Sequence, residues 1–586
     1  MFPVKRRIDL YHVFDLLSIV AVPLGLGLQN PSWIYPRWYD IDEWVYVGYG
    51  YRYLNPTFYS ENYKISRLPW VLTEALIRGT FPPPTASWIL SFGVLALGNV
   101  ALYFALRLTF GRASALITSI FIAGFTFMYA NGGADYHNTL AGAFYCFSTF
   151  LCALYARRQF DLRHPTLLGA VVALTIHTNI VFINLVPLLL AQYWLCYRIY
   201  HGKHPPLLTF VLAALVGALG ITIFLGLINL SVGRQFFFFL QQFKIVRYFL
   251  ADSARQQIWW YSWSSHWYLD HAYMGVFLAG VLLSCATLAL TPSRRSLPSQ
   301  YTCARLFSVA YLCAVLIWIF WQSIGQTAFE PLYFAFPLGF PLAGTLAATL
   351  AIVVVEEVRP IVLTVFGACF AALTIVALRE AVLIDQFVGG VSWPFAVRVA
   401  IAFSLAFALL LLLRSSLAIA PVAVFALCIA NAIAVADKAS YAATSCSLNR
   451  DAYELILKAG NLLRKINVPR PSIYLFADYG EELKLGAGCH DRKALLSQLD
   501  DAIAADGEFQ SAASAWSKRT LETLDPERWR EMIAAHGVMA FQTYDAGRIS
   551  VLRNKVIAAG GAPGQMRFFS LRSGDVELPL YILPLN

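Results

Sequence analysis

The sequence predicts a polytopic α-helical membrane protein followed by a smaller soluble α/β domain. Of its 586 residues, 58% are hydrophobic and only 13% are charged, whereas about 25% of the residues in a soluble globular protein are charged. The apolar residues are gathered in segments of about 20 residues, which is the length that an α-helix needs to cross the hydrocarbon core of a bilayer. Aromatic residues make up 15% of the chain, as expected where tyrosine and tryptophan line both membrane interfaces.

About thirteen apolar segments are expected to cross the membrane, and they define a transmembrane region over residues 1–436. The first segment, 12–29, is not followed by a small-residue cleavage site, so we expect it to remain as a helix. The other expected spans lie near 86–108, 113–130, 138–156, 166–182, 183–199, 207–230, 274–291, 306–322, 332–354, 361–378, 396–413 and 417–436.

The basic residues indicate the orientation of these spans. Lysine and arginine gather in every second connection, beginning with Lys5, Arg6 and Arg7, and by the positive-inside rule these connections face the cytoplasm. An odd number of spans then places the C-terminal region on the external side. The net charge of +10 is spread over the connections rather than gathered on one folded face, so we do not expect the protein to bind nucleic acid.

Three connections that carry polar or aromatic clusters are external in this topology, at 30–85, 131–137 and 231–273. The first two contain carboxylates, which we expect to meet at one membrane–water boundary. The third begins with "FFFFLQQFKIVRYFL", whose pattern predicts an amphipathic interfacial helix. The residues of these loops that are suited to chemistry are Asp40, Asp42, Glu43, Tyr46, Lys64, Arg67, Asp135, His137, Trp263 and His266.

Residues 437–586 have the charge density of a soluble protein and a mixed pattern of hydrophobicity. We expect strands at 471–478 and 578–584 and a helix at 491–506. These elements predict a small α/β domain on the external side of the membrane. The sequence of this domain contains no recognised catalytic or nucleotide-binding motif.

Two cysteines, Cys446 and Cys489, lie in this C-terminal region, whereas the other cysteines lie in or beside apolar spans. A pair of cysteines in an oxidising compartment predicts a disulfide bond. In the third external loop, His266, Asp270 and His271 lie close together, and a divalent metal site is one interpretation of them. An aromatic membrane anchor is the simpler interpretation of the same loop. No cofactor is required by the sequence.

Short motifs in this chain resemble those of the GT-C glycosyltransferases, the superfamily of the lipid A aminoarabinose transferases and the protein O-mannosyltransferases. "DEWVY" (42–46) is similar to the Asp-Glu-x-x-aromatic motif in the first external loop of these enzymes. "SRLPWVLTEAL" (66–76) and "EPLYFAFPLGFPLAG" (330–344) resemble their segments before the second span and before a late helix. The aminoarabinose enzymes usually have arginine at the position of Val45 and a basic residue at that of Glu330, so the chain differs there.

This resemblance implies an inverting glycosyltransferase of a bacterial inner membrane, with its active site on the periplasmic side. The donor would be a monosaccharide linked to a polyprenyl phosphate, and the acceptor a hydroxyl of an envelope glycolipid, lipopolysaccharide or polysaccharide. A protein O-mannosyltransferase-like enzyme is the alternative within the superfamily. A non-enzymatic transporter or flippase of lipid-linked sugars is the alternative from another class, and it would need ionisable residues inside the membrane.

The chemistry of such a transfer suggests a role for each candidate. A hydroxyl needs a base in the transition state, and an aspartate is ionised at neutral pH. By its place in the motif Asp42 is the predicted base, with Asp40 as the alternative, and Glu43 and Asp135 would orient the base or the acceptor. The leaving phosphate requires cations, for which Arg67 is the first candidate and Lys64 the second. The candidates for contacts with the sugar or acceptor are His137, Tyr46, Trp263, His266 and Tyr333.

Overall fold

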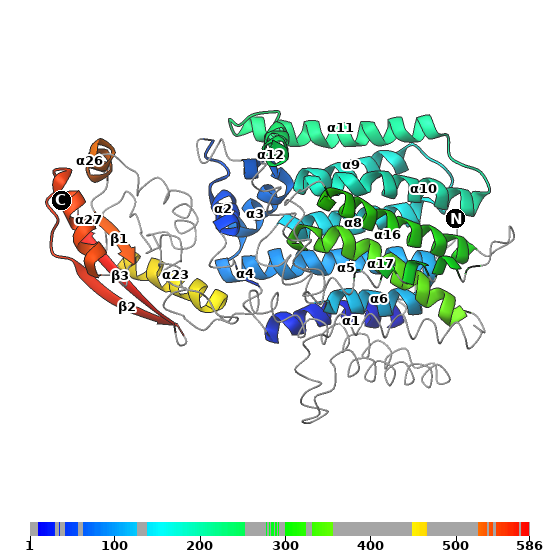
Figure 1. Ribbon diagram of the computed structural model, residues 1–586, viewed down its shortest axis with the longest axis horizontal. Helices are drawn as coiled ribbons and strands as arrows, with labels where there is room; N and C mark the ends of the chain where they lie inside the picture. Colours follow the sequence, from blue (N-terminus) through cyan, green and yellow to red (C-terminus); the bar gives the residue numbers. More distant parts are fainter. Residues whose placement is uncertain are drawn as a thin grey trace, which may run out of the picture.

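The structure, a computed structural model, consists of a bundle of long helices and, beyond one end of it, a small sheet with flanking helices (Figure 1). The residues that it describes are 10–29, 34–35, 41–56, 63–125, 137–251, parts of 277–291, 299–323, 331–355, 448–465, 526–535, 538–542, 546–573 and 576–584.

The helices of the bundle follow the expected spans closely. They are α1 (Leu10–Gln29), α4 (Pro83–Trp88) continued by η3 (Ile89–Gly93) and α5 (Val94–Phe110), α6 (Arg112–Gly124), α8 (His137–Tyr155), α9 (Arg163–Thr178), η4 (Ile180–Leu185) with α10 (Val186–His201), α11 (Leu207–Ser231), α16 (Ser299–Ser323) and α17 (Pro331–Val355).

Among the described residues, 4 helices are long and apolar enough to cross a membrane. They are Pro83–Phe110, Ile180–His201, Leu207–Ser231 and Ser299–Trp321. The spans expected at 361–378, 396–413 and 417–436 lie outside the described residues. The expected total of about thirteen therefore stays a prediction.

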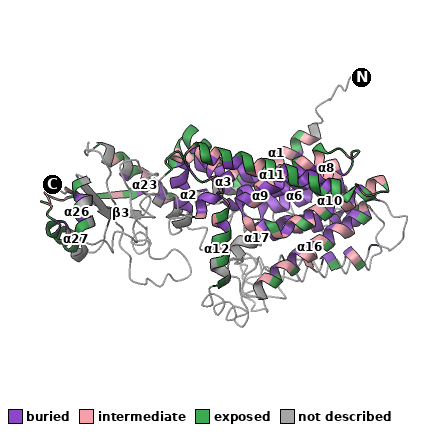
Figure 2. Cartoon of the chain, turned by 90° about the horizontal axis from the view of Figure 1, so that it is seen from above, coloured by how far each residue is buried: buried purple, intermediate pink, exposed green. Residues whose placement is uncertain are grey.

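Helix α8 lies in the interior of the bundle, and small residues let its neighbours approach it closely. It packs against α5, where a β-carbon added at Gly98 would lie 3.0 Å from the Cα of Ala143. It also packs against α17, where a β-carbon at Gly142 would lie 2.6 Å from the ring of Phe340. Figure 2 shows that buried residues fill the middle of this bundle. The start of α8 is thus held firmly by its packing.

Helix α11 lies along one edge of the bundle (Figure 1) and presents an apolar face outward. Leu208, Val216 and Leu219 on this helix are 72%, 64% and 60% exposed. A run of exposed leucine and valine over 25 residues is unusual in a soluble protein and fits contact with lipid chains.

An ion pair between a buried carboxylate and a partly exposed guanidinium connects three helices of the bundle. Asp15 of α1 accepts hydrogen bonds from Nε and Nη2 of Arg112 of α6, both at 2.7 Å. The hydroxyl of Tyr103 on α5 donates to the same carboxylate at 2.6 Å. Because a buried carboxylate is stable only with such partners, this contact fixes the spacing of α1, α5 and α6.

The C-terminal region contains a three-stranded antiparallel sheet of order β1-β3-β2. Its strands are β1 (Val538–Gln542), β2 (Arg567–Ser573) and β3 (Val576–Pro584), and the flanking helices are α23 (Leu448–Lys465), α26 (Pro526–Ala535) and α27 (Ala546–Ala558). Strand β3 includes the strand expected at 578–584. The elements expected at 471–478 and 491–506, and both Cys446 and Cys489, lie outside the described residues.

Helix α23 connects this sheet to the helical bundle. On one side, Glu454 accepts a hydrogen bond of 2.7 Å from Ser573 of β2, and this bond, together with Arg450, lowers the pKa of the Glu454 carboxyl. On the other side, the ring of Tyr453 stacks on that of Tyr35 with 4.6 Å between centroids. The described C-terminal elements therefore lie at one end of the bundle (Figure 1), beside Tyr35 of the first loop.

Helices α9 and α11 touch through two glycines. A β-carbon at Gly169 would lie 1.9 Å from the carbonyl oxygen of Ala214, and one at Gly217 would lie 1.8 Å from that of Thr166. Backbone atoms cannot move aside as a flexible side chain can. The contact is therefore possible only with hydrogen at both positions.

Replacing Gly217 by leucine should force α9 and α11 apart and destabilise the folded protein by about 1–3 kcal/mol, the usual cost of overpacking. Gly220→Leu is the matched control, since it lies on the same helix and nothing lies within 4 Å of its added β-carbon. The measurement is thermal unfolding in detergent. Equal melting temperatures for the two variants would contradict the predicted contact.

Candidate active site

Four segments converge where the first loop meets the bundle: α2 (Ile41–Arg52), η2 (Tyr63–Ser66), α3 (Leu68–Thr80) and the start of α8. Helix α2 begins one residue before Asp42 and Glu43, so both acids lie in its first turn. The unpaired N–H groups and the dipole of a helix N-terminus stabilise carboxylates there. Glu43 is fully buried. For Asp42 the structure describes the main chain only.

Helix α2 is fixed against α3 by a close backbone contact. A β-carbon at Gly50 would lie 3.0 Å from Cδ of Arg78 and 3.2 Å from Cβ of Glu74. Glu74 and Arg78 are themselves a buried pair on α3, with 3.6 Å between Nε and Oε1. Tyr46 and Trp70 add fully buried aromatic contact to the same apolar cluster. The acidic turn of α2 thus rests on a rigid support.

Two cations lie over the ring of Tyr63: Lys64 of η2 and Arg67, the residue that follows this turn. In a 3₁₀-helix, residues three apart in sequence eclipse one another, and Arg67 N donates to Lys64 O at 3.1 Å to continue this pattern. The carbonyl of Arg67 then accepts from the N–H of Trp70 at 3.0 Å and begins α3. Pro69 occupies the first turn of α3, where its missing N–H costs nothing. Both ends of the Arg67 main chain are therefore fixed.

The Arg67 side chain lies among aromatic rings. Its Nη1 donates to the hydroxyl of Tyr46 and lies 2.9 Å from Nδ1 of His137. The guanidinium also lies over the ring of Tyr46, 5.7 Å from its centroid, and over that of Tyr63, at 5.5 Å. Arginine has no acceptor atom, so Nδ1 of His137 must accept and carries no proton. The imidazole is accordingly neutral in this arrangement.

Lys64 adds a second positive charge beside Arg67. Its side chain is only 4% exposed, and its Nζ lies 5.9 Å from the centroid of the Tyr63 ring. A guanidinium and an ammonium on one face form a good binding site for a phosphate group, because arginine offers a planar fork and lysine a compact charge. We name Tyr46, Lys64, Arg67 and His137 the basic cluster.

Two buried carboxamides hold the basic cluster in place. Asn138 of α8 accepts a 2.6 Å bond from Asn179, which also accepts from the N–H of Val181 and so fixes the junction of α9 and η4. Gln242 of α12 (Leu240–Ala251) donates to the carbonyl of Ser66 at 3.0 Å and to that of His177 at 3.2 Å. Neither Asn138 nor Gln242 was among the residues predicted from the sequence.

Of the predicted site residues, Tyr46, Lys64, Arg67 and His137 lie together, and Glu43 lies one helical turn before Tyr46. Tyr333 lies in α17, where the structure describes its main chain only. Asp40, Asp135, Trp263 and His266 lie outside the described residues, as do Asp270 and His271 of the suggested metal set. Within the part of the chain that is described, no group of three or more His, Cys, Asp or Glu residues could hold a metal ion.

The fold is that of the GT-C membrane glycosyltransferases, which confirms the resemblance predicted from the sequence at the level of the fold. In particular, the chain is similar to ArnT from Cupriavidus metallidurans bound to undecaprenyl phosphate, with a TM-score of 0.51 and 14% sequence identity. The similarity covers 96% of this chain and 98% of that one. Together with the apolar helices, this fold makes the chain a membrane protein.

Two other solved structures are similar to a smaller extent. The apo form of the same ArnT has a TM-score of 0.49 at 12% identity, covering 96% of this chain and 97% of that one. The other is the archaeal oligosaccharyltransferase AglB from Archaeoglobus fulgidus, in complex with an inhibitory peptide and a dolichol-phosphate. It has a TM-score of 0.38 at 13% identity, and the similarity covers 91% of this chain and 69% of that one. No protein-family model matches the chain, and no curated protein matches it in sequence.

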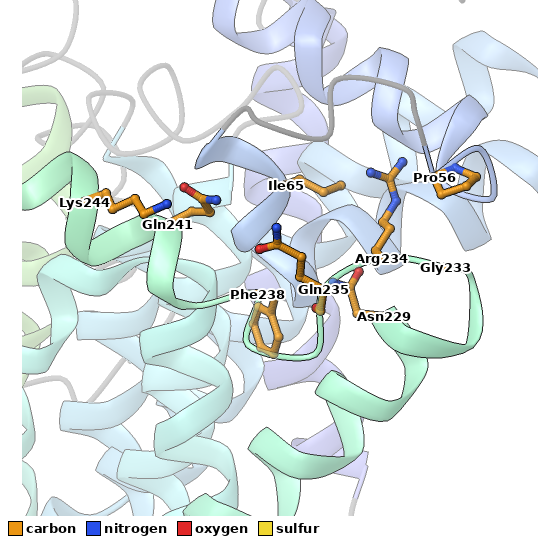
Figure 3. Close-up of a pocket in the computed structure, with 9 residues that line it drawn as sticks. All are labelled: Pro56, Ile65, Asn229, Gly233, Arg234, Gln235, Phe238, Gln241 and Lys244. Carbon is orange, nitrogen blue, oxygen red and sulfur yellow. Dashed lines mark hydrogen bonds between the residues drawn. The ribbon is translucent and has the colours of Figure 1, made fainter.

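Replacing Gln242 by leucine should loosen the basic cluster without removing any of its members. The change leaves two buried carbonyls unpaired, which costs about 1–3 kcal/mol for each group. Hydrogen exchange at the amides of 63–67 should therefore become faster in the variant. The neighbouring Gln241→Leu is the control, since Gln241 faces the cavity of about 610 Å³ beside η2 (Figure 3) rather than these carbonyls. Unchanged exchange at 63–67 would show that Gln242 does not hold η2.

Proposed function

We propose that this chain is an inverting glycosyltransferase that moves a monosaccharide from a polyprenyl-phosphate donor to a hydroxyl of an envelope glycolipid, lipopolysaccharide or polysaccharide. The observation that supports this most is the basic cluster, which lies beside the acidic first turn of α2 in a membrane fold. The undecaprenyl phosphate bound to the similar ArnT supports a polyprenyl-phosphate carrier. The site would face the periplasm across a bacterial inner membrane.

In this mechanism the phosphate of the donor binds at Arg67 and Lys64. The guanidinium fork contacts two phosphate oxygens, and the ammonium of Lys64 adds a second charge. Negative charge on the phosphate grows as the bond between the anomeric carbon and the phosphate oxygen breaks. Cations that are already fixed in position stabilise this charge without reorganising. A phosphate leaves as a stable anion, so no general acid is needed.

The acceptor hydroxyl attacks the anomeric carbon from the face opposite the phosphate. As the new carbon–oxygen bond forms, the hydroxyl proton passes to the carboxylate of Asp42, and the electron pair of the broken bond leaves on the phosphate. Attack from the opposite face inverts the configuration of the sugar. Glu43 and Asp135 orient the base or the acceptor, and Asp40 is the alternative base.

The neutral imidazole of His137 has a defined part in this scheme. Because its Nδ1 accepts from Arg67, the ring holds the guanidinium in position without competing for it as a carboxylate would. The phenol of Tyr46 does the same on another side. Tyr46 and His137 thus both orient Arg67, the proposed contact of the donor phosphate.

Asp42→Asn should lower the transfer rate by about 10²–10⁴-fold, the usual contribution of a general base, while leaving the protein folded. The assay measures release of polyprenyl phosphate from polyprenyl-phosphate sugars in nanodiscs containing envelope glycolipids. Asp40→Asn is the matched comparison because it changes the alternative base. Full activity in Asp42→Asn, with loss in Asp40→Asn, would move the role of base to Asp40.

Arg67→Lys should lower kcat/KM for the donor by about 10-fold or more, because it keeps the charge but loses the fork and the bond to His137. Arg52→Lys, at the exposed end of α2, is the matched control and should change nothing. The same assay with diphosphate-linked sugars should show little release from either protein. Equal values of kcat/KM for Arg67→Lys and the unchanged protein would show that Arg67 does not bind the donor phosphate.

A further inference from the structure

Six cysteines lie in the described part of the chain, and all of them are free thiols. Two of these, Cys196 of α10 and Cys303 of α16, are distant in sequence, yet their thiols share a hydrogen bond. Cys196 is only 6% exposed and Cys303 is fully buried. An apolar side chain would fill the same space, so packing alone does not account for two thiols in contact.

The pair lies close to one end of both helices. Cys196 and Cys303 are each just over one helical turn from the end of α10 and the start of α16, respectively. The adjacent basic residues, among them Arg157, Arg158 and Lys203, are expected to face the cytoplasm by the positive-inside rule. Because the cytoplasm is a reducing compartment, the pair is expected to exist there as thiols at rest.

A chain of polar contacts ends at the sulfur of Cys303. Nη2 of Arg157 donates to the hydroxyl of Tyr200 at 3.3 Å, and the guanidinium lies over the same ring, 4.9 Å from its centroid. The hydroxyl of Tyr200 in turn shares a hydrogen bond with Cys303. Since Arg157 is the donor in the first of these bonds, the O–H of Tyr200 can donate to the sulfur.

These contacts give the two thiols different parts. The sulfur of Cys303 accepts from Tyr200 and from the S–H of Cys196, and the positive charge of Arg157 lies nearby. The thiolate is the nucleophilic form of cysteine, and hydrogen bonds and a cation are what it requires from its surroundings. Cys303 is therefore the attacking cysteine of the pair. Cys196, which keeps its proton, is the resolving one.

Helices α10 and α16 also meet at their other ends. Nε1 of Trp321, near the end of α16, donates at 3.1 Å to Oδ1 of Asn184, which lies in the turn η4 before α10. A covalent bond at the cysteine pair would thus join two helices that are already tied at the opposite end. It would also close a long loop that contains α11 and α12, and such a loop closure restricts the unfolded chain.

We propose that Cys196 and Cys303 form a reversible redox site, at which a peroxide converts the two thiols into a disulfide that fixes α10 against α16. The site rests on these contacts alone and not on the proposed function. A dithiol reductant returns the pair to thiols by thiol–disulfide exchange.

The oxidation has two steps. The sulfur of Cys303 attacks one oxygen of hydrogen peroxide, so that an S–O bond forms and the O–O bond breaks. The hydroxide that leaves takes up the proton that Cys303 has lost. The sulfur of Cys196 then attacks the sulfenic sulfur, an S–S bond forms, and the departing hydroxide leaves as water with the proton of Cys196. The two thiols lose two electrons, and the peroxide is reduced to two molecules of water.

Disulfide formation is measured in the full-length protein in nanodiscs. The protein is treated with hydrogen peroxide, denatured with N-ethylmaleimide to block the remaining thiols, and mapped by mass spectrometry without reduction. A peptide pair linked through Cys196 and Cys303 is expected, and a dithiol reductant added before the maleimide should abolish it. Maleimide on both cysteines after the peroxide, or a link from Cys196 to the nearby Cys152 instead, would overturn the proposal.

Single substitutions test the order of the two steps. In Cys196→Ser no disulfide can form at this site, and Cys303 should be trapped as a sulfenic acid by dimedone that is present during denaturation. In Cys303→Ser, Cys196 should give little of this adduct because it lacks the activating contacts. Equal labelling of the remaining cysteine in the two variants would refute the division of roles.

Tyr200→Phe should slow disulfide formation about 10-fold, because it removes a hydrogen bond to a charged sulfur. Tyr197→Phe is the matched control, since Tyr197 lies on the same helix and its hydroxyl accepts from the N–H of Phe160. The rate is followed by quenching the peroxide reaction with maleimide at successive times. Equal rates in the two variants would refute the activation of Cys303 by Tyr200.

The disulfide should also raise the melting temperature of the unchanged protein by several degrees, because it restricts the unfolded chain. The shift on peroxide treatment is compared with that of Cys196→Ser, which should show no rise. A linked peptide without a rise in melting temperature would show that the bond does not fix α10 against α16. None of these measurements uses the transfer reaction, so their failure would leave the proposed function standing.

Discussion

The contact on which this site depends is the one between the Arg67 guanidinium and two uncharged partners, the phenol of Tyr46 and the imidazole of His137. A carboxylate in either place would orient the arginine equally well but would compete with an incoming phosphate. Neutral acceptors orient it without neutralising its charge themselves. The electrostatic character of the site therefore follows from the identity of the partners as much as from that of the cation.

Such a contact needs accurate positioning, and the fold provides it from three directions. Tyr46 is carried by α2, which rests on α3 at Gly50. His137 begins α8, whose neighbours approach it through glycines and whose first turn is tied at Asn138 to Asn179. Gln242 holds the turn that precedes Arg67. Since each segment comes from a different part of the chain, the site forms only when this end of the bundle is complete.

The sequence predicted those parts of the structure that depend on local composition. A run of apolar residues over 207–230 is sufficient to predict α11 (Leu207–Ser231), because a helix is the only single segment that satisfies its own backbone in lipid. Arg67, Tyr46 and His137 were found as candidates by residue type and by resemblance to a known motif. The role of Gln242 was not predictable, because its partners lie 176 and 65 residues away and nothing in the local sequence indicates them.

The same limit explains why the cavity beside η2 was not predicted, although Lys244 was recognised as part of an amphipathic helix. The charge of Lys244 is a local property, but its position opposite Arg234 results from the turn at Gly233 and from the carbonyls of Tyr53 and Asn55, just past the end of α2. One turn of backbone separates the basic cluster from this cavity, since Lys64 and Arg67 belong to the cluster whereas Ile65 lines the cavity. The arrangement results from contacts between segments that are distant in sequence, so no local pattern could indicate it.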